Sequence, residues 1–313
     1  MKVVLLESLA ISQEALNNYK EELNHAGHTF EAYEREDDPE LQIERAKDAD
    51  VIMIANMPLS GQVIEACKNL KFIDVAFTGV DHVDLEAARR CGVAVSNASG
   101  YSNEAVAELV LGMVLSLLRN VSQVEARCRE GKTKDGLVGT ELKGKTVGII
   151  GTGAIGARVA QLFHSFGCTI IAYDTFTKET PYIQYLEMDD VLRKADIVTV
   201  HCPLTADTKG LIGAKKFALM KQGAYFINAA RGPIVDSGAL AEALNAGKLA
   251  GAGVDVFEVE PPLPLAHPLL GARNCIVTPH IAFASKESMI LRAQIVFKSL
   301  EEWMKGNQIN KII

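Results

Sequence analysis

The chain has 313 residues, of which 48% are hydrophobic and 23% charged, and its formal net charge is −7. A chain of this length favours two domains over one, because single hydrophobic cores stop growing near this size. Lysine and arginine are scattered rather than clustered, so we expect no nucleic-acid partner, since such a partner requires a broad basic surface.

The cysteines and the apolar segments indicate in which cellular compartment the protein is expected. No two cysteines form a CxxC pair and none has metal-ligand spacing with a histidine, so we predict no metal site and interpret all six as buried free thiols in a reducing cytoplasm. They are Cys67, Cys91, Cys128, Cys168, Cys202 and Cys275. The longest apolar helical segment, residues 106–118, is too short for a membrane span and contains Glu108. The N-terminal run VVLL is typical of a strand rather than a signal peptide, so we expect a cytoplasmic protein without a membrane partner.

The first hundred residues alternate short β-branched runs with helical stretches. Strands are predicted at residues 3–6, 29–33, 51–55, 71–77 and 93–97. Residues 12–26 predict an amphipathic helix with Ser12 as its N-cap and Gly27 at its end. These units predict a parallel sheet that is covered on both faces, in a first domain of roughly residues 1–100.

A long apolar helix is predicted at residues 102–119, and the polar stretch 125–136 follows it. A second α/β series begins at Leu142, with strands predicted at residues 145–151, 169–174, 196–202, 223–228, 252–257 and 274–279. The final helix, residues 285–305, is apolar on one face and is expected to return to the first domain. The expected fold is α/β with two Rossmann-like, doubly wound parallel-sheet domains, one of residues 1–100 plus 285–313 and one of residues 101–284.

Gly151, Gly153 and Gly156 have the G-x-G-x-x-G spacing, which by itself often arises by chance. Here the glycines follow an apolar strand and open a helix, and the next strand ends in Asp174, 18 residues after Gly156. This context indicates a dinucleotide-binding fingerprint. Gly151 permits the tight turn, Gly153 lets a pyrophosphate approach the backbone, and Gly156 lets the helix pack closely on the strand.

Asp174 indicates which dinucleotide is bound. Its carboxylate can accept hydrogen bonds from the adenosine ribose hydroxyls, but it repels a 2′-phosphate. The residues that follow it, TFT, contain no arginine that would neutralise such a phosphate. We therefore predict NAD rather than NADP as the cofactor.

Three polar side chains follow the later strands of the second domain. They are Arg231 in NAARG, Glu260 in DVFEVEPP and His280 in IVTPHIA. In an open parallel sheet, ligands bind beyond the carboxyl ends of the strands. A guanidinium can bind a carboxylate and polarise a carbonyl, a histidine can exchange a proton near neutral pH, and a carboxylate beside it favours the imidazolium. Each of the three residues taken alone could have a purely structural role. Together, and following the dinucleotide-binding fingerprint in the chain, they predict a catalytic group.

The ordered segments GTGAIG, YD, HCPLT, NAARGPIVD, GVDVFEVEP and TPHIA resemble the D-isomer-specific 2-hydroxyacid dehydrogenase family. The resemblance covers roughly residues 70–285, and the first seventy residues match only in their pattern. It implies two domains hinged about a cleft, usually in a homodimer. It also implies hydride transfer between NAD(H) and C2 of a 2-keto or 2-hydroxy acid, with the stereochemistry that the family name states.

The resemblance also implies a role for each matched residue. Arg231 would bind the substrate, His280 would be the general acid/base, and Glu260 would be its partner. Asp255 would contact the nicotinamide amide. Besides the three glycines and Asp174, the cofactor would be contacted by Asn103, Ala154, Ile155, His201, Cys202, Pro203, Thr208, Ala229 and Ala230.

The substrate-binding candidates of the first domain are Asn56, Phe77, Thr78, Gly79, Val80 and Tyr101. The segment AFTGVDHVD, residues 76–84, resembles the family loop whose backbone N–H groups bind the substrate carboxylate, and its glycine suits an anion-binding nest. Phe77 stands where the family often has a smaller residue, so it either narrows the pocket or simply fills the core. No arginine or lysine lies on this loop or on residues 56–60, so a phosphorylated substrate would leave an anion unpaired. We expect small or modestly apolar 2-keto acids, among them glyoxylate, hydroxypyruvate and branched or aromatic acids.

Two other functions stay open from the sequence. The family's fold also serves as an NADH-sensing transcriptional corepressor, which would bind dinucleotide with little turnover. A closer alternative is a dehydrogenase of the same superfamily that acts on formate or a phosphonate-like anion. Formate enzymes carry a glutamine near the catalytic histidine, and the segment IVTPHIAFAS contains none.

Overall fold

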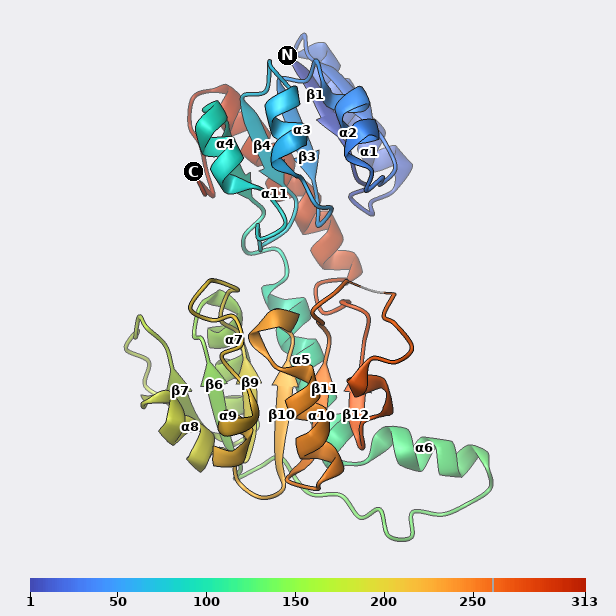
Figure 1. The fold of residues 1–313 in the computed structure, drawn as a ribbon, viewed down its shortest axis with the longest axis vertical. Helices are drawn as coiled ribbons and strands as arrows, with labels where there is room; N and C mark the ends of the chain where they lie inside the picture. The colour runs from blue at the N-terminus through green and yellow to red at the C-terminus, as the bar shows by residue number, and fades with distance from the viewer. Residues whose placement is uncertain (261) are drawn as a thin grey trace. The chain divides into compact units, whose positions relative to one another are not determined.

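In the computed structural model, which describes residues 1–260 and 262–313, the chain forms two compact units (Figure 1). Unit 1 comprises Met1–Ser102 and Ala284–Ile313, and unit 2 comprises Asn103–Phe283. The last residue of the GVDVFEVEP segment, Pro261, lies outside the described residues. Both units are built around an all-parallel sheet, which confirms the predicted fold class.

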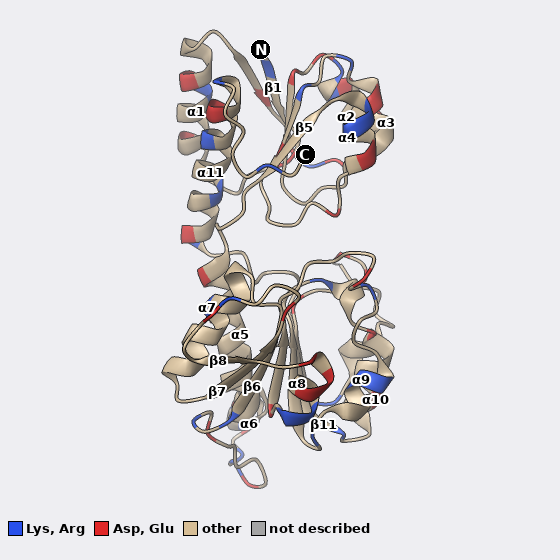
Figure 2. Ribbon diagram, turned by 90° about the vertical axis from the view of Figure 1, so that its left-hand side faces the viewer, with Lys and Arg blue, Asp and Glu red and all other residues tan. Residues whose placement is uncertain are grey.

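Unit 1 holds a five-stranded sheet in the order β2-β1-β3-β4-β5. Its strands are β1 (Lys2–Leu5), β2 (Thr29–Ala32), β3 (Val51–Ile54), β4 (Phe72–Val75) and β5 (Ala94–Asn97). Its helices are α1 (Gln13–His25), α2 (Pro39–Ala46), α3 (Gly61–Ala66), α4 (Leu85–Cys91) and α11 (Lys286–Met304). The helices α1 and α11 cover one face of the sheet, and the other three cover the opposite face (Figure 2).

Local contacts explain where α1 begins and ends and how α11 packs in unit 1. The Ser12 hydroxyl accepts a hydrogen bond from the backbone N–H of Ala15, and Gly27 stops α1 with a left-handed φ of +80°. α11 packs on the sheet through Trp303, whose ring stacks on that of Phe72 with centroids 4.6 Å apart. The final helix therefore belongs to unit 1.

Asp74 is a fully buried acidic side chain in the sheet of unit 1. It sits on β4, between β3 and β5, and is 0% exposed. Burial raises the pKa of Asp74 well above its ordinary value, and the Ser299 hydroxyl of α11 offsets this only in part. The folded state therefore favours the protonated form of Asp74 more than the unfolded chain does.

We expect the replacement Asp74→Asn to raise the free energy of unfolding at pH 7 by about 1–3 kcal/mol. The stability supplied by the protonated carboxyl is fully present below the unfolded pKa, about 3.9, and is lost as the pH rises towards the raised folded pKa. Urea unfolding between pH 4 and pH 8 should therefore show a flatter stability curve for the variant. The exposed control Asp48→Asn should leave the curve unchanged, and equal slopes for all three proteins would contradict the assignment.

Unit 2 holds a seven-stranded sheet in the order β12-β11-β10-β9-β6-β7-β8. Its strands are β6 (Thr146–Ile150), β7 (Thr169–Tyr173), β8 (Ile183–Tyr185), β9 (Ile197–Val200), β10 (Ala224–Asn228), β11 (Leu249–Val254) and β12 (Cys275–Val277). Its α-helices are α5 (Asn103–Leu118), α6 (Val121–Arg129), α7 (Ala154–Ser165), α8 (Met188–Lys194), α9 (Ala214–Leu219) and α10 (Ser237–Asn245). Sequence reasoning missed β8, because a strand of only three residues is too short for its alternation to be recognised.

Separate hydrophobic cores cover the two faces of this sheet. On one face, Val110 of α5 and Phe163 of α7 are fully buried. On the other face, Phe217 of α9 meets Phe226 of β10 edge to face, with ring centroids 5.2 Å apart. Helices thus cover both faces of the sheet. The loops at the carboxyl ends of its strands are the part of the sheet where ligands can bind.

The predicted helix at residues 102–119 is present as α5 and is mostly buried within unit 2. A second helix, α6, begins after a short break and takes up part of the stretch that the sequence marked only as polar. Among the described helices, none alone is long and apolar enough to span a membrane. α5 and α6 together would suffice by length and composition, but they are bent by 61°.

The cysteine prediction is partly wrong. All six cysteines are free thiols and Cys67 and Cys168 are buried, but Cys91 and Cys128 are exposed. Both exposed thiols lie near the ends of surface helices, where a short side chain can face solvent without disturbing the core.

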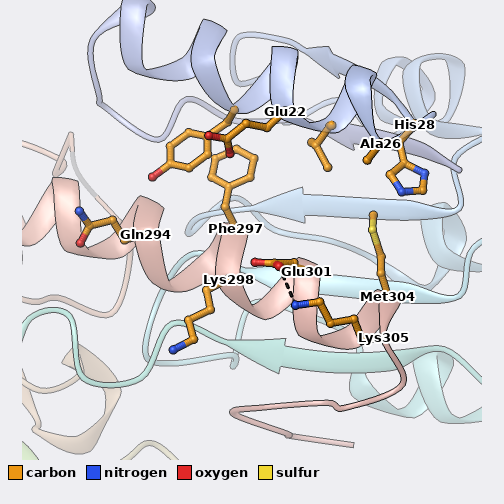
Figure 3. Close-up of a pocket in the computed structure, with 11 residues that line it drawn as sticks. Glu22, Ala26, His28, Gln294, Phe297, Lys298, Glu301, Met304 and Lys305 are labelled. Carbon is orange, nitrogen blue, oxygen red and sulfur yellow. Dashed lines mark hydrogen bonds and ion pairs between the residues drawn. The ribbon is translucent and has the colours of Figure 1, made fainter.

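A pocket of about 690 Å³ lies in unit 1 between α1 and α11 (Figure 3). The rings of Tyr19 and Phe297 stack at one end of it, and Glu22, Lys298 and Glu301 line it. None of its lining residues was selected by the sequence analysis. In Figure 2, basic and acidic segments are interspersed over the helices, which agrees with the scattered charges of the sequence.

Candidate active site

The glycine turn of unit 2 has the geometry of a phosphate-binding loop. Gly151 has a left-handed φ of +95°, and a Cβ there would lie 2.6 Å from the backbone nitrogen of Cys202. A Cβ on Gly156 would lie 2.0 Å from the Gly151 carbonyl oxygen, so only glycine lets α7 pack this close to the turn. Gly153 caps α7, and a Cβ on it would meet nothing within 4 Å. The open space before the first N–H groups of α7, where Ala154 and Ile155 lie, therefore fits a pyrophosphate.

Asp174 follows β7 directly and faces this turn. Its Oδ2 accepts hydrogen bonds from the Thr152 N–H at 2.5 Å and the Thr152 hydroxyl at 3.0 Å, and its Oδ1 accepts one from the Phe176 N–H at 2.9 Å. Burial acts to raise the pKa of Asp174, but the donors from Phe176 and Thr152 outweigh it and hold the pKa below its ordinary value. The carboxylate is thus ionised and ready to accept a ribose hydroxyl.

The other predicted cofactor residues lie on loops of the same sheet. Burial lowers the pKa of His201 to about 3, so its ring is neutral, and its Nε2 lies 2.8 Å from the Thr199 hydroxyl. Burial raises the pKa of the Cys202 thiol to about 11. The Thr208 hydroxyl donates to the Pro203 carbonyl at 2.6 Å and so closes its own turn. Half-buried Asn103 begins α5, and half-buried Ala229 and Ala230 follow β10. Their contacts with NAD stay predictions.

Arg231 lies just beyond β10, in an extended backbone with φ −147°. The Asn228 side chain donates to the Arg231 carbonyl at 3.0 Å, and the guanidinium donates to the Ala230 carbonyl at 2.9 Å. The next residue, Gly232, lies so close to the loop after β11 that a Cβ would be 1.8 Å from the Phe257 carbonyl carbon. The loop that carries Arg231 is therefore pressed against a neighbouring loop and held in place.

We expect the replacement Gly232→Ala to destabilise the protein by at least about 2 kcal/mol, because the atoms that a Cβ would meet belong to the backbone and cannot rotate away. Urea unfolding would measure the loss. The control is Gly112→Ala in α5, where a Cβ meets nothing within 4 Å and alanine should stabilise the helix by up to about 1 kcal/mol. A Gly232→Ala variant as stable as the wild type would contradict this account of the loop.

His280 and Glu260 form the pair that the sequence predicted. The imidazole Nδ1 lies 3.0 Å from Glu260 Oε1 and 2.9 Å from Oε2. The His280 side chain is 10% exposed and that of Glu260 is 53% exposed, so solvent reaches the pair mainly from the carboxylate side. The ring of His280 also meets that of Phe283 edge to face, at 5.3 Å. The carboxylate thus engages the ring at Nδ1, and the proton exchange of His280 with a ligand stays a prediction.

The backbone at His280 is left-handed, with φ +55°, which is unusual for a residue other than glycine. Asp255 holds this conformation. Its carbonyl accepts the His280 N–H at 2.8 Å, and its carboxylate accepts the N–H groups of Ile281 and Ala282 and the Thr278 hydroxyl. Burial raises the pKa of Asp255, and these donors oppose the shift. Asp255 is 0% exposed, so it positions the histidine turn here, and its contact with the nicotinamide amide stays a prediction.

In unit 1, the segment 78–80 offers its backbone to a ligand. Within the described part of the chain, the N–H groups of Thr78, Gly79 and Val80 donate to no protein acceptor. The loop is nonetheless anchored, since Asn97 donates to the Thr78 carbonyl at 2.6 Å and Val83 to the Val80 carbonyl at 3.0 Å. Free donors on an anchored turn are what an anion-binding nest requires.

Phe77 and Tyr101 are buried in unit 1, at 4% and 3% exposed, with ring centroids 6.2 Å apart. This favours the core-filling alternative for Phe77. The guanidinium of Arg292, from α11, lies over the Tyr101 ring at 5.9 Å and donates to the Leu9 carbonyl at 2.7 Å. Sequence reasoning missed Arg292, because one arginine within an apolar helical pattern resembles a surface residue.

The loop at Asn56 is held by two residues that sequence reasoning also missed. Glu7 is 7% exposed, and its Oε2 accepts the N–H groups of Ala55 and Met57, both at 2.8 Å. Arg35 donates to Glu7 and to the Asn56 side-chain oxygen, both at 3.1 Å. The signal available for Glu7 was a carboxylate directly after an apolar strand. With its oxygen bound to Arg35, Asn56 presents its amide N–H groups as donors.

Comparisons with known proteins agree with this arrangement. Residues 111–282 match the family model of the D-isomer specific 2-hydroxyacid dehydrogenase, NAD binding domain. The chain is 35% identical to a hydroxypyruvate reductase of Blautia hydrogenotrophica, and the match covers 88% of each chain.

Solved structures extend the comparison over the whole chain. A D-lactate dehydrogenase from Aquifex aeolicus, complexed with NAD and lactic acid, matches with a TM-score of 0.89 and 29% identity, covering 100% of this chain and 99% of the other. An acyclic imino acid reductase in complex with NADPH and D-Arg matches with a TM-score of 0.92 and 26% identity, covering 100% of both. Together with the glycine turn and the His280–Glu260 pair, the family match over more than half of the chain shows that this protein belongs to the D-isomer-specific 2-hydroxyacid dehydrogenase family.

Proposed function

We propose that this NAD-dependent oxidoreductase interconverts a small, non-phosphorylated 2-keto acid and its D-2-hydroxy acid, with His280 as the general acid/base. The His280–Glu260 contact carries the proposal, because it supplies a histidine held by a carboxylate next to a strand end that a ligand can reach. The glycine turn and Asp174 would hold NAD, whose reduced nicotinamide supplies the hydride when it is bound.

Each residue then has one task in keto-acid reduction. Arg231 binds the substrate carboxylate through its guanidinium and stabilises the negative charge that develops on the carbonyl oxygen. His280 in its protonated form donates the proton from Nε2 to that oxygen as C2 accepts the hydride. Glu260 fixes the orientation of the ring by binding Nδ1. In hydroxy-acid oxidation, neutral His280 removes the hydroxyl proton, so reduction should persist to lower pH than oxidation does.

The proposed substrate class follows from the protein groups that could bind the carboxylate of a 2-keto acid. The donors at residues 78–80 suit a carboxylate, and so does the guanidinium of Arg231. Arg35 and Arg292, near Asn56 and Tyr101, already donate to protein acceptors. A second anion on the substrate would thus compete with contacts that the protein itself makes. This supports glyoxylate, hydroxypyruvate and modestly apolar 2-keto acids as substrates.

The test is NADH oxidation, followed at 340 nm, with glyoxylate, hydroxypyruvate, pyruvate, 4-methyl-2-oxopentanoate and phenylpyruvate, with NADPH run in parallel. Turnover of one or more acids to the D-hydroxy product, checked by chiral chromatography, is the expected result. Tight NADH binding without turnover of any acid would contradict the proposal and favour an NADH-sensing binding protein instead.

We also propose that the protein is a homodimer in the cytoplasm, where its free thiols would stay reduced. None of the residues of α6 is buried in the chain by itself, and Val121 and Val138 are 51% and 80% exposed. A second copy of the chain would cover this surface. Light scattering after gel filtration should give twice the mass of one chain, and the variant Val138→Glu should shift the equilibrium towards the monomer. A wild-type monomer at micromolar concentration would contradict the proposal.

A further inference from the structure

A chain of hydrogen bonds in unit 2 leads from the edge strand β8 to Asp174. The Tyr185 hydroxyl lies 3.0 Å from the Thr152 hydroxyl, which in turn lies 3.0 Å from Asp174 Oδ2. The backbone N–H of Thr152 binds the same carboxylate oxygen at 2.5 Å. Thr152 is 5% exposed and sits between Gly151 and Gly153, inside the phosphate-binding turn.

The direction of these bonds follows from counting protons. A threonine hydroxyl has one proton, and the ionised carboxylate can only accept. The Thr152 proton is therefore donated to Asp174, so Tyr185 must donate its own proton to the Thr152 oxygen. Each donor in such a chain polarises the next, which strengthens the final bond to the carboxylate. The Lys178 N–H approaches the Tyr185 oxygen at 3.5 Å, from the loop that also carries Asp174.

The same count shows what Asp174 has left for a ligand. Both bonding positions of Oδ2 are used by Thr152, and the Phe176 N–H uses one position of Oδ1. The Thr175 N–H also favours the ionised carboxylate, so the protein supplies most of the donors to Asp174, and Oδ1 is the less used oxygen on which a ribose hydroxyl could be accepted. A carboxylate bound from both ends cannot turn away to relieve repulsion by a 2′-phosphate, because turning would break several bonds to a charged group.

We propose that Thr152 and Tyr185 are positioning residues that set the preference for NAD over NADP, by holding Asp174 so that its charge cannot move away from the 2′ position. This rests on the proposed NAD preference and adds to it the residues that enforce it. The fold by itself does not decide the cofactor, because structures of this shape are found with NAD and with NADPH.

The test measures dissociation constants for NADH and NADPH by titration calorimetry without any keto acid, with ADP-ribose and its 2′-phosphate as a second pair. The variants are Thr152→Val, which removes the hydroxyl but keeps the N–H, and Tyr185→Phe. We expect the NADPH-to-NADH ratio of dissociation constants to fall about tenfold in Thr152→Val, the effect of losing one hydrogen bond to a charged group, and about threefold in Tyr185→Phe. Thr152→Ser should restore the wild-type ratio.

The control is Tyr182→Phe, because Tyr182 stacks on His164 and takes no part in the chain of bonds. A ratio that stays at the wild-type value in both variants would overturn the proposal, and so would an equal loss of affinity for the two cofactors. If Thr152→Val failed to fold, the Tyr185→Phe variant, at a half-buried position, would test the proposal by itself. Because no turnover is measured, a failure of the proposed reaction would leave this result intact.

Discussion

Replacing His280 by asparagine should lower kcat for keto-acid reduction by about 10²- to 10⁴-fold, the range for the loss of a general acid. Asparagine is the informative choice, because His280 has a left-handed φ of +55° that asparagine tolerates better than alanine does. The Asp255 contacts that hold the turn involve only backbone groups at residues 280–282 and would remain. NADH affinity should therefore change little.

The pH profiles provide the sharper test of His280. In the wild type, reduction should persist to lower pH than oxidation, because reduction uses the protonated imidazole and oxidation uses the neutral ring. In His280→Asn this difference between the two directions should vanish. As a control, His164→Asn on α7 removes a histidine that stacks on Tyr182 and should leave both profiles unchanged. Profiles that still differed in the His280 variant would contradict its role.

Replacing Arg231 by lysine should lower kcat/KM by about 10²-fold and Arg231→Gln by about 10³-fold. Lysine keeps a charge but loses the planar fork that binds a carboxylate through two parallel bonds. The guanidinium donates to the Ala230 carbonyl at 2.9 Å, and this hydrogen bond holds it in a fixed orientation. A small loss in the lysine variant and a large one in the glutamine variant would indicate that charge alone matters.

The control for Arg231 is Arg193→Gln, which removes a half-exposed arginine that pairs with carboxylates on its own helix. Its kcat/KM should stay within about twofold of the wild type, because such surface pairs contribute little. NADH dissociation constants measured alongside would separate substrate binding from cofactor binding. Equal kinetics for the wild type and Arg231→Gln would rule out Arg231 as the substrate-binding group.

The sequence by itself determined most of the order of the elements and predicted where the chemistry takes place. Alternating β-branched runs and helical stretches specify parallel sheets, because a strand that is buried on both faces must be continuously apolar. Gly151 and Gly156 were readable because the turn after β6 and the start of α7 leave no room for a Cβ, and His280 was readable because it follows the last predicted strand. Strand β8 was not predicted, because a short strand at the edge of a sheet can form with few hydrophobic residues.

Only the tertiary structure decided which residues hold the site residues in place. Glu7 meets the loop of Asn56, Arg292 meets Tyr101, and Tyr185 reaches Asp174 through Thr152, each over a separation in sequence that leaves no local pattern. It also showed that Asp255 and Phe77 are buried, whereas the sequence left open whether Phe77 fills the core or narrows a pocket. Periodicity encodes which side of an element faces the core, but a hydrogen bond between distant loops depends on where folding brings their atoms.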